Sequence, residues 1–147
     1  MSEKNRDLIN QLKALNESID LLTKGTTMLL ASERKAFSKA SFTDIPKAPG
    51  VYTIHNTKLR AIIYIGRTGN LRRRLLGNHK SGNVRGSQFR KALGSCFNLQ
   101  SEDQITQYIL DNCDFQYIVI KGFGEMVRLE HFATAVLAPV LNVKLKQ

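Results

Sequence analysis

The 147-residue sequence predicts one domain of the α/β (α+β) class, preceded by an N-terminal helical arm. Two segments rich in strand formers, residues 51–55 and 61–65, flank a short polar turn and predict an antiparallel hairpin. Residues 115–120 form a third strand-like segment. Apolar residues at helical spacing before and after these strands predict the helices of this class.

The N-terminal arm, residues 3 to about 37, is predicted as a helix because apolar side chains recur at steps of three and four. The Lys-Gly-Thr-Thr segment 24–27 is expected to interrupt this helix. These apolar side chains form a stripe along the helix, which consists of Leu8, Leu12, Leu15, Ile19 and Leu22. The arm has three possible roles. The simplest is packing on the main domain, and the others are pairing with a second copy or a partner protein and contact with nucleic acid.

Turn and capping residues divide the rest of the chain. Two prolines and a glycine in residues 46–50 predict an extended entry to the first strand. Asn70 and Ser87 are N-cap candidates for two short basic helices. Residues 101–104 have the spacing of a capping box. The predicted helices are 71–77, 88–93, 101–110 and 124–137, the last ended by Pro139, and residues 140–145 are a short strand or a tail.

The charge of the chain is unevenly distributed. The net charge is +10, and residues 45–101 contain no aspartate or glutamate. An ordinary solvated surface mixes both signs, so a one-signed segment indicates a polyanionic partner. A basic face kept for solubility is the alternative. The segment contains Lys47, Lys58, Arg60, Arg67, Arg72, Arg73, Arg74, Lys80, Arg85, Arg90 and Lys91.

Two cysteines, Cys96 and Cys113, match no zinc-binding or redox spacing and are expected to be reduced. No apolar run approaches the roughly 20 residues of a membrane helix. The N-terminal residues lack the apolar region of a secretory signal. The expected location is therefore the cytoplasm.

Each strand of the predicted hairpin carries a short motif. Gly50-Val51-Tyr52 lies at the start of the first strand and Tyr64-Ile65-Gly66 at the end of the second. Together with the basic segment 70–75, a late Glu130 and the segment 139–142, these triplets make the sequence resemble the GIY-YIG nuclease family. Valine in the first triplet is a common variation of that family. The resemblance implies a small antiparallel β-sheet flanked by helices, and a metal-dependent DNA endonuclease.

Glu130 is the candidate metal ligand. At helical spacing its neighbours include Met126, Val127 and Ala133, so it lies on a mostly apolar face. A charged group there is costly unless it is paired or binds a metal. Carboxylates hold Mg²⁺, which keeps several of its waters. A salt bridge to an arginine is the alternative, and the resemblance favours the metal, Mg²⁺ or Mn²⁺.

Tyr52 and Tyr64 are the next candidates, with core packing as their alternative role. A phenol has a pKa of about 10, and a nearby arginine and metal would lower it enough for proton uptake from water. The resemblance implies that Tyr52 is the general base or orients the water, and that Tyr64 positions the water or a phosphate. Arg74 matches the family's catalytic arginine, whose planar guanidinium suits two phosphate oxygens.

His79 departs from the family pattern. Many members have a His or Tyr four residues after the catalytic arginine, and here that position is Asn78. His79 lies five residues after Arg74. A helix break at Gly77 would let His79 reach the site, and we favour this over Asn78.

Further residues are predicted to bind nucleic acid. Arg67 follows the second triplet, and the basic loop and helix start at 82–91 offer amides and charges to phosphates. Asn142 matches a late family asparagine that contacts a phosphate or braces the site, with a turn role as its alternative. The predicted nucleic-acid-binding set is Arg67, Arg72, Arg73, Lys80, Arg85, Arg90, Lys91 and Asn142.

These observations divide the chain into an arm, residues 1–42, and a nuclease domain, residues 43–147. The predicted function is metal-dependent hydrolysis of phosphodiester bonds in double-stranded or branched DNA. A non-catalytic nucleic-acid-binding module on the same fold is the alternative. A degenerate copy would lack Glu130, Arg74 or a triplet tyrosine, and this sequence keeps them all. A partner-binding domain would leave the acid-free segment unexplained.

Overall fold

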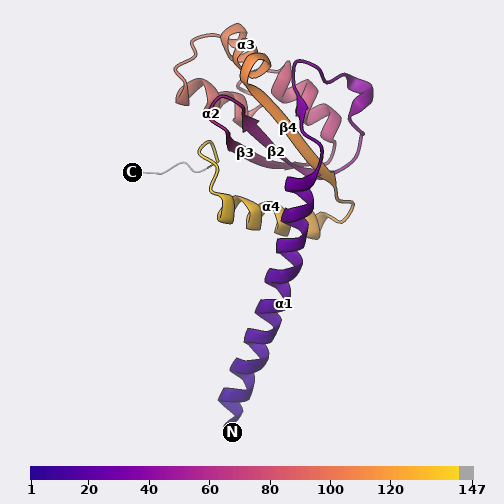
Figure 1. Ribbon diagram of the computed structural model, residues 1–147, viewed down its shortest axis with the longest axis vertical. Helices are drawn as coiled ribbons and strands as arrows, with labels where there is room; N and C mark the ends of the chain where they lie inside the picture. Colours follow the sequence, from indigo (N-terminus) through magenta and orange to yellow (C-terminus); the bar gives the residue numbers. More distant parts are fainter. Residues whose placement is uncertain (143–147) are drawn as a thin grey trace.

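The computed structural model describes residues 1–142. A long helix, α1, leads into a small α+β domain, and its N-terminal half projects away from that domain (Figure 1). The elements in chain order are α1 (Glu3–Ala31), β1 (Lys35–Ala36), η1 (Phe42–Asp44), β2 (Gly50–Asn56), β3 (Ala61–Thr68), η2 (Arg73–Lys80), α2 (Gln88–Cys96), α3 (Glu102–Asn112), β4 (Cys113–Val119) and α4 (Phe123–Leu137).

The four strands form one antiparallel sheet in the order β1-β4-β2-β3. β2 is central and every one of its residues is buried. The predicted hairpin is β2–β3, with Tyr52 opposite Gly66 and Ile54 opposite Tyr64, and a register shift after Ile54. The predicted third strand is β4, which pairs with the other edge of β2. β3 is an edge strand, and the pocket described below opens beside it.

Each face of the sheet has its own core because successive strand residues point to opposite sides. Val51 and Ile65 pack with Leu29 of α1 and with Met126 and Leu129 of α4. The other face has a larger core. It includes Phe37, Tyr52, Ile54, Ile63, Leu71, Leu75, Leu76, Phe89, Leu93, Ile105, Ile109 and Phe115, contributed by β2–β4, η2, α2, α3 and the segment after β1.

The helix α1 is continuous, so the predicted interruption at 24–27 is wrong. The hydroxyls of Thr26 and Thr27 donate to carbonyls four residues earlier, at 2.9 and 2.8 Å, and so remain compatible with the helix. Gly25 serves close packing, since a Cβ there would lie 3.1 Å from a methyl of Leu129. The helix ends at Ala31 rather than near residue 37, because the chain then turns into β1.

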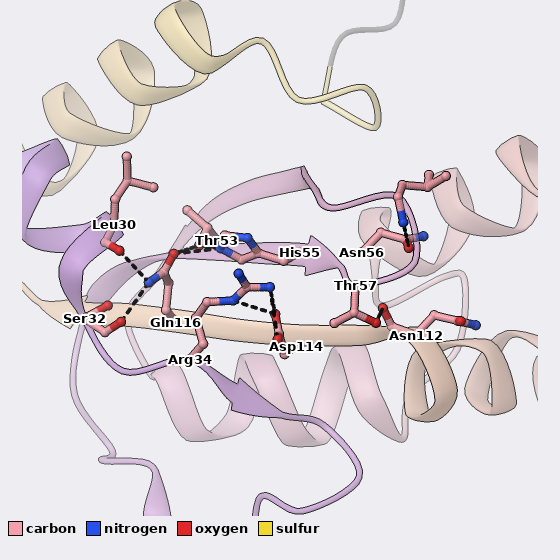
Figure 2. A network of polar contacts seen from close by, with 11 residues as sticks. Leu30, Ser32, Arg34, Thr53, His55, Asn56, Thr57, Asn112, Asp114 and Gln116 are labelled. Carbon is pink, nitrogen blue, oxygen red and sulfur yellow. Dashed lines mark hydrogen bonds and ion pairs between the residues drawn. The ribbon is translucent and has the colours of Figure 1, made fainter.

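A buried polar network fastens the end of α1 to the sheet (Figure 2). The side-chain amide of Gln116, on β4, donates to the carbonyls of Leu30 and Ser32 at 3.1 and 2.9 Å. Its oxygen accepts from Thr53 Oγ1 at 3.1 Å and from His55 Nε2 at 2.7 Å. Because amide, hydroxyl and imidazole are all paired, the direction of the arm is set by specific hydrogen bonds as well as by packing.

The remaining elements follow the predicted order with shifted ends. Asn70 Oδ1 accepts from the amide of Arg73, and Ser87 and Ser101 cap α2 and α3 as expected. Residues 140–142 form a turn, and the rest of the predicted 140–145 element lies outside the described residues. β1 and Phe37 belong to the sheet and core, so packing joins residues 35–42 to the domain that follows. Within residues 1–142, no helix has the length and apolarity needed to cross a bilayer.

Candidate active site

A pocket of about 360 Å³ opens beside the edge strand β3. It collects side chains from β2, β3, η2 and α4, together with the loop before α2 and the first residue of that helix. All five residues predicted to be catalytic line it. The lining residues are Tyr52, Tyr64, Gly66, Arg67, Arg74, His79, Arg85, Gly86, Gln88 and Glu130. A larger groove of about 820 Å³ between α2 and residues 140–142 shares Tyr64 and Gln88 with this pocket and holds none of the other predicted catalytic residues.

The buried end of the pocket is a chain of three hydrogen-bonding side chains. Tyr52 Oη lies 2.6 Å from His79 Nε2, and His79 Nδ1 lies 2.7 Å from Ser87 Oγ. Tyr52 is 2% exposed, and His79 and Ser87 are each 1% exposed. The chain therefore begins at the pocket and runs inward, where bulk water does not compete for its protons.

The helix η2 explains why His79 takes part. It is a π-helix, which has hydrogen bonds between residues five apart and therefore more residues per turn than an α-helix. Arg74 and His79, five residues apart, consequently lie on one face. Asn78 lines a neighbouring cavity with Arg73 and Thr68. The predicted break at Gly77 is wrong, because one wider turn brings the histidine into place while the helix continues to Lys80.

Glycine is required opposite Tyr52. A Cβ at Gly66 would overlap the hydroxyl and ring of Tyr52, since the two residues face each other across the hairpin. A Cβ at Gly50 would overlap the carbonyl of Ile118 on β4. The two triplet glycines therefore allow close approach within the sheet, and Gly66 makes room for the phenol.

Burial dominates the electrostatics of the proton-carrying groups. It raises the pKa of Tyr52 well above its usual value, with the neighbouring Tyr64 adding to the shift, although Arg74 opposes it. Burial likewise raises the pKa of Tyr64. Arg74 acts on the pKa of both tyrosines in the expected direction, lowering it, but burial outweighs this effect. Burial, with Arg74 and Arg90, lowers the pKa of His79 to about 3, so the imidazole is neutral at pH 7.

Glu130 reaches the pocket from α4 and forms an ion pair there. Its Oε2 lies 3.2 Å from Arg67 Nη1 on β3 and 3.5 Å from His131 Nε2. The Glu130 side chain is 14% exposed. All its ion pairs within residues 1–142 use Oε2. The predicted alternative, a salt bridge to arginine, is thus present, and it holds the carboxylate at the pocket.

The donor set fits a hard divalent cation. Among residues 1–142, no group of three His, Cys, Asp or Glu side chains could form a closed metal cage. Mg²⁺ needs no such cage, because it is held by one or two carboxylates and keeps several waters. Glu130 in an open pocket meets that requirement, whereas zinc would need more protein ligands.

The prediction that Arg90 binds nucleic acid is wrong. Its side chain is completely buried. Its Nη1 donates to the carbonyls of His79 and Lys80, and its Nη2 to the carbonyl of Glu102 and to Thr106 Oγ1, all at 3.0–3.2 Å. Arg90 therefore ties the end of η2 to α3.

The other predicted nucleic-acid-binding residues differ in what they contact. Arg72 Nε donates to the carbonyl of Ile45 at 2.7 Å, and Lys80 Nζ donates to the carbonyl of Ala40 at 3.2 Å. Both are half-buried and serve packing in this structure. The charged side chains with exposed positions are Arg67 and Arg85 in the pocket, Arg73 beside it and Lys91 on α2.

Asn142 braces the second triplet. Its Oδ1 accepts from the amide of Ile65 at 2.8 Å, and its Nδ2 donates to the carbonyl of the same residue at 2.7 Å. The amide of Leu141 also donates to the carbonyl of Ile63. Both polar atoms of the Asn142 side chain thus bond to the backbone of β3, which corresponds to the bracing role.

Gly86, Ser87 and Gln88 lie in the segment 82–91 that the sequence predicts to contact nucleic acid, but the sequence does not assign them to the catalytic pocket. Ser87 also has the predicted N-cap role, since its Oγ accepts from the amide of Arg90 at 3.1 Å. No sequence signal shows that the same oxygen also meets His79. The contact depends on how the loop 81–86 returns α2 to the end of η2.

This α+β fold, with two tyrosines, a neutral histidine, an arginine and a glutamate around one open pocket, defines a catalytic domain of the nuclease class. The chain belongs to the GIY-YIG family, since the family model of the GIY-YIG catalytic domain matches residues 37–147.

Solved structures with a similar fold include the N-terminal endonuclease domain of UvrC from Thermotoga maritima. A tyrosine-to-phenylalanine variant with its catalytic divalent cation is 24% identical, with a TM-score of 0.46, over 75% of this chain and 99% of that domain. An asparagine-to-alanine variant is 23% identical, with the same TM-score and coverage. The magnesium-bound form is 24% identical, with a TM-score of 0.45, over 74% and 99%. No curated protein matches the chain.

Proposed function

We propose that this protein is a metal-dependent endonuclease that hydrolyses phosphodiester bonds of double-stranded or branched DNA. The observation that supports it most is the convergence of Tyr52, Tyr64, Arg74, His79 and Glu130 on one pocket. A module that only bound nucleic acid would need the arginines, but it would have no use for a buried proton chain.

In this proposal, Arg74 binds the scissile phosphate. It lines both the pocket and the neighbouring cavity that contains Asn70 and Arg73. A guanidinium can contact two phosphate oxygens at once and keeps its charge during the reaction. Arg74 also lies close enough to His79 to lower the pKa of that imidazole. The charge that binds the phosphate thus also keeps the neighbouring imidazole neutral.

The proposed path of the proton runs from the attacking water to Tyr52 and then to His79. The phenol passes its own proton to His79 Nε2 as it accepts one from water, so a tyrosinate, which burial disfavours, is never fully formed. In this proposal His79 Nδ1–H donates to Ser87 Oγ, 2.7 Å away, and this contact keeps the tautomer in which Nε2 is free to accept. The bound phosphate, being negative, offsets the charge that develops on the imidazole.

Glu130 is the proposed metal ligand. A bound Mg²⁺ or Mn²⁺ would stabilise the negative charge that builds up on the phosphate and on the leaving oxygen. Arg67 pairs with this carboxylate at 3.2 Å, and its guanidinium would be available to a phosphate if Glu130 held a cation instead. The same pair compensates the charge of a carboxylate that lies beside the core next to α4.

The decisive experiment is cleavage of supercoiled plasmid and of a branched synthetic duplex by wild type, Glu130→Ala and Glu125→Ala, with Mg²⁺, with Mn²⁺ and with EDTA. Glu125 is an exposed acid in the first turn of the same helix and serves as the matched control. Loss of a group that stabilises transition-state charge costs roughly 100-fold or more in rate. We expect that loss for Glu130→Ala and for EDTA, and none for Glu125→Ala.

DNA binding should be measured on the same samples by anisotropy over a range of salt concentrations. Phosphate contacts made by exposed arginines and lysines predict affinity that falls steeply with salt. Equal binding by wild type and Glu130→Ala, with no cleavage by either in any metal, would replace the endonuclease with a non-catalytic nucleic-acid-binding module.

A further inference from the structure

The N-terminal half of α1 carries an apolar stripe that nothing in its own domain covers. Leu8, Leu12, Leu15 and Ile19 are 41–53% exposed, and this part of the helix projects beyond the domain (Figure 1). The burial that holds the helix to the domain starts near Leu22. The projecting part of the helix, residues 3–17, has about the length at which an isolated helix is only marginally stable in water. A stable arm therefore requires a surface that covers the stripe.

The stripe follows a heptad pattern. Residues 5, 12 and 19 occupy one set of core positions, and residues 8, 15 and 22 the other, with alternating steps of three and four. The second set is all leucine, and the first set is Asn5, Leu12 and Ile19. In parallel two-stranded coiled coils, leucine at d with isoleucine and a single asparagine at a is the favoured combination. The pattern therefore fits two identical helices in register.

The charges of the arm also fit a second copy better than DNA. Residues 1–24 contain four basic side chains, Lys4, Arg6, Lys13 and Lys24, and four acidic ones, Glu3, Asp7, Glu17 and Asp20, so their sum is zero. The net charge of +10 lies entirely in the rest of the chain. Of the positions that flank the stripe, Ile9, Gln11, Asn16, Ser18 and Thr23 are uncharged and Lys4 is basic. In a parallel pair Lys4 lies next to Ile9 of the other helix, so no like charges oppose self-pairing.

The domain leaves the stripe free because it packs on a different side of α1. Residues 18, 22, 25, 26 and 29 face the domain, as their burial and the approach of Gly25 to Leu129 show, and Leu22 belongs to both this face and the end of the stripe. At 3.6 residues per turn, the centre of this face lies about 65° around the helix from the centre of the stripe. Gln116 fixes the base of the helix against the sheet (Figure 2). A partner helix can therefore lie along the stripe beside α4.

We propose that two copies of this chain pair through the N-terminal half of α1 as a short parallel coiled coil. The pairing holds two domains at the same end of the coil, each on a fixed base. If the proposed function holds, two pockets in one assembly favour cutting both strands of a duplex rather than nicking one. That last consequence rests on the proposed function, whereas the pairing itself does not.

The pairing is tested by sedimentation of wild type, Leu15→Glu and Leu21→Glu over a wide micromolar concentration range. Leu21 is the matched control, because it is 65% exposed on the same helix but lies off the stripe. Wild type and Leu21→Glu are expected to dimerise, and Leu15→Glu to remain monomeric with an unchanged sheet and core by circular dichroism. A monomeric wild type, or a dimer that survives Leu15→Glu, would overturn the proposal.

The orientation is tested by disulfide crosslinking of Leu8→Cys in a Cys96→Ser background, which removes the exposed native thiol. In a parallel pair, residue 8 faces its own copy and crosslinks readily. An antiparallel pair of the same stripes would place residue 8 opposite residue 19. Efficient crosslinking only between Leu8→Cys and Ile19→Cys chains, and not between two Leu8→Cys chains, would overturn the parallel arrangement.

Plasmid cleavage separates this inference from the proposed function. Neither Leu15 nor Leu21 lies in the pocket, so both variants are expected to keep nicking activity if the protein is an endonuclease. Leu15→Glu should lose linear product relative to nicked product, and Leu21→Glu should not. A wild-type dimer that only nicks would contradict the two-pocket consequence, while a dimer without any cleavage would leave the pairing intact and remove the proposed function.

Discussion

The side chains of the candidate pocket and of the hydrogen-bond chain behind it, residues 52, 64, 74, 79, 87 and 130, come from distant parts of the chain and are buried or half-buried. In the N-terminal half of α1, residues 5–19 are one continuous segment, and all of them except Ser18 are exposed. The pocket depends on long-range contacts that fix each polar atom, so a small change in shape disrupts it. The arm depends on a repeated local pattern, so a substitution there changes what the molecule binds far more than whether it folds.

The largest effect is expected from Gly66→Ala. The added methyl overlaps the hydroxyl of Tyr52 and must displace the phenol from His79. Cleavage is expected to fall roughly 100-fold or more, since the proton chain is broken. Gly69→Ala in the following loop is the control, because a Cβ there has no atom within 4 Å. Equal rates for the two variants would mean that the Tyr52–His79 contact does not matter for cleavage.

Arg90→Met should lower the free energy of unfolding by about 3 kcal/mol, because it leaves buried carbonyls of η2 and α3 without a donor. Lys91→Met, at the exposed neighbouring position, should change it by less than about 0.5 kcal/mol. Urea unfolding measures both. The slope of DNA affinity against salt concentration should show the opposite order of effects. Lys91→Met should reduce this slope if Lys91 contacts a phosphate, and Arg90→Met should leave it unchanged.

The pH dependence of stability reports on His79. Its pKa in the folded protein, about 3, is depressed below the unfolded value of 6.5, so the unfolded chain takes up the proton first as pH falls. The stability that this group contributes is complete above pH 6.5 and is lost as pH decreases toward 3, by up to about 1.4 kcal/mol per pH unit. Unfolding of wild type and His79→Gln across this range should show a shallower slope for the variant.

The smallest effect is expected in the arm. Leu29→Ala removes a fully buried side chain and should cost about 3 kcal/mol. Leu15→Ala removes the same side chain from an exposed position of the same helix. At concentrations too low for pairing, it should cost less than about 0.5 kcal/mol. A loss for Leu15→Ala that matches Leu29→Ala under those conditions would show that the stripe is covered within a single chain.

The sequence alone determined the elements with strong local signals. The hairpin, the third strand, the late helix and the caps at Asn70, Ser87 and Ser101 follow from side-chain alternation and from short-range hydrogen bonds, which depend on neighbours along the chain. The heptad stripe of α1 is local in the same sense. The motifs also identified the five predicted catalytic residues, all of which line the pocket, because the order of strands and helices is itself encoded in these patterns.

Only the tertiary structure decided how individual polar groups are used. Whether Arg90 faces solvent or the core, whether Ser87 meets His79, and whether Asn142 braces β3 depend on contacts between residues far apart in the chain. The wider turn of η2 and the unbroken helix at Gly25 arise for the same reason. Local preferences for a π-turn or a glycine break differ by about 1 kcal/mol or less, and the packing of a complete core outweighs them.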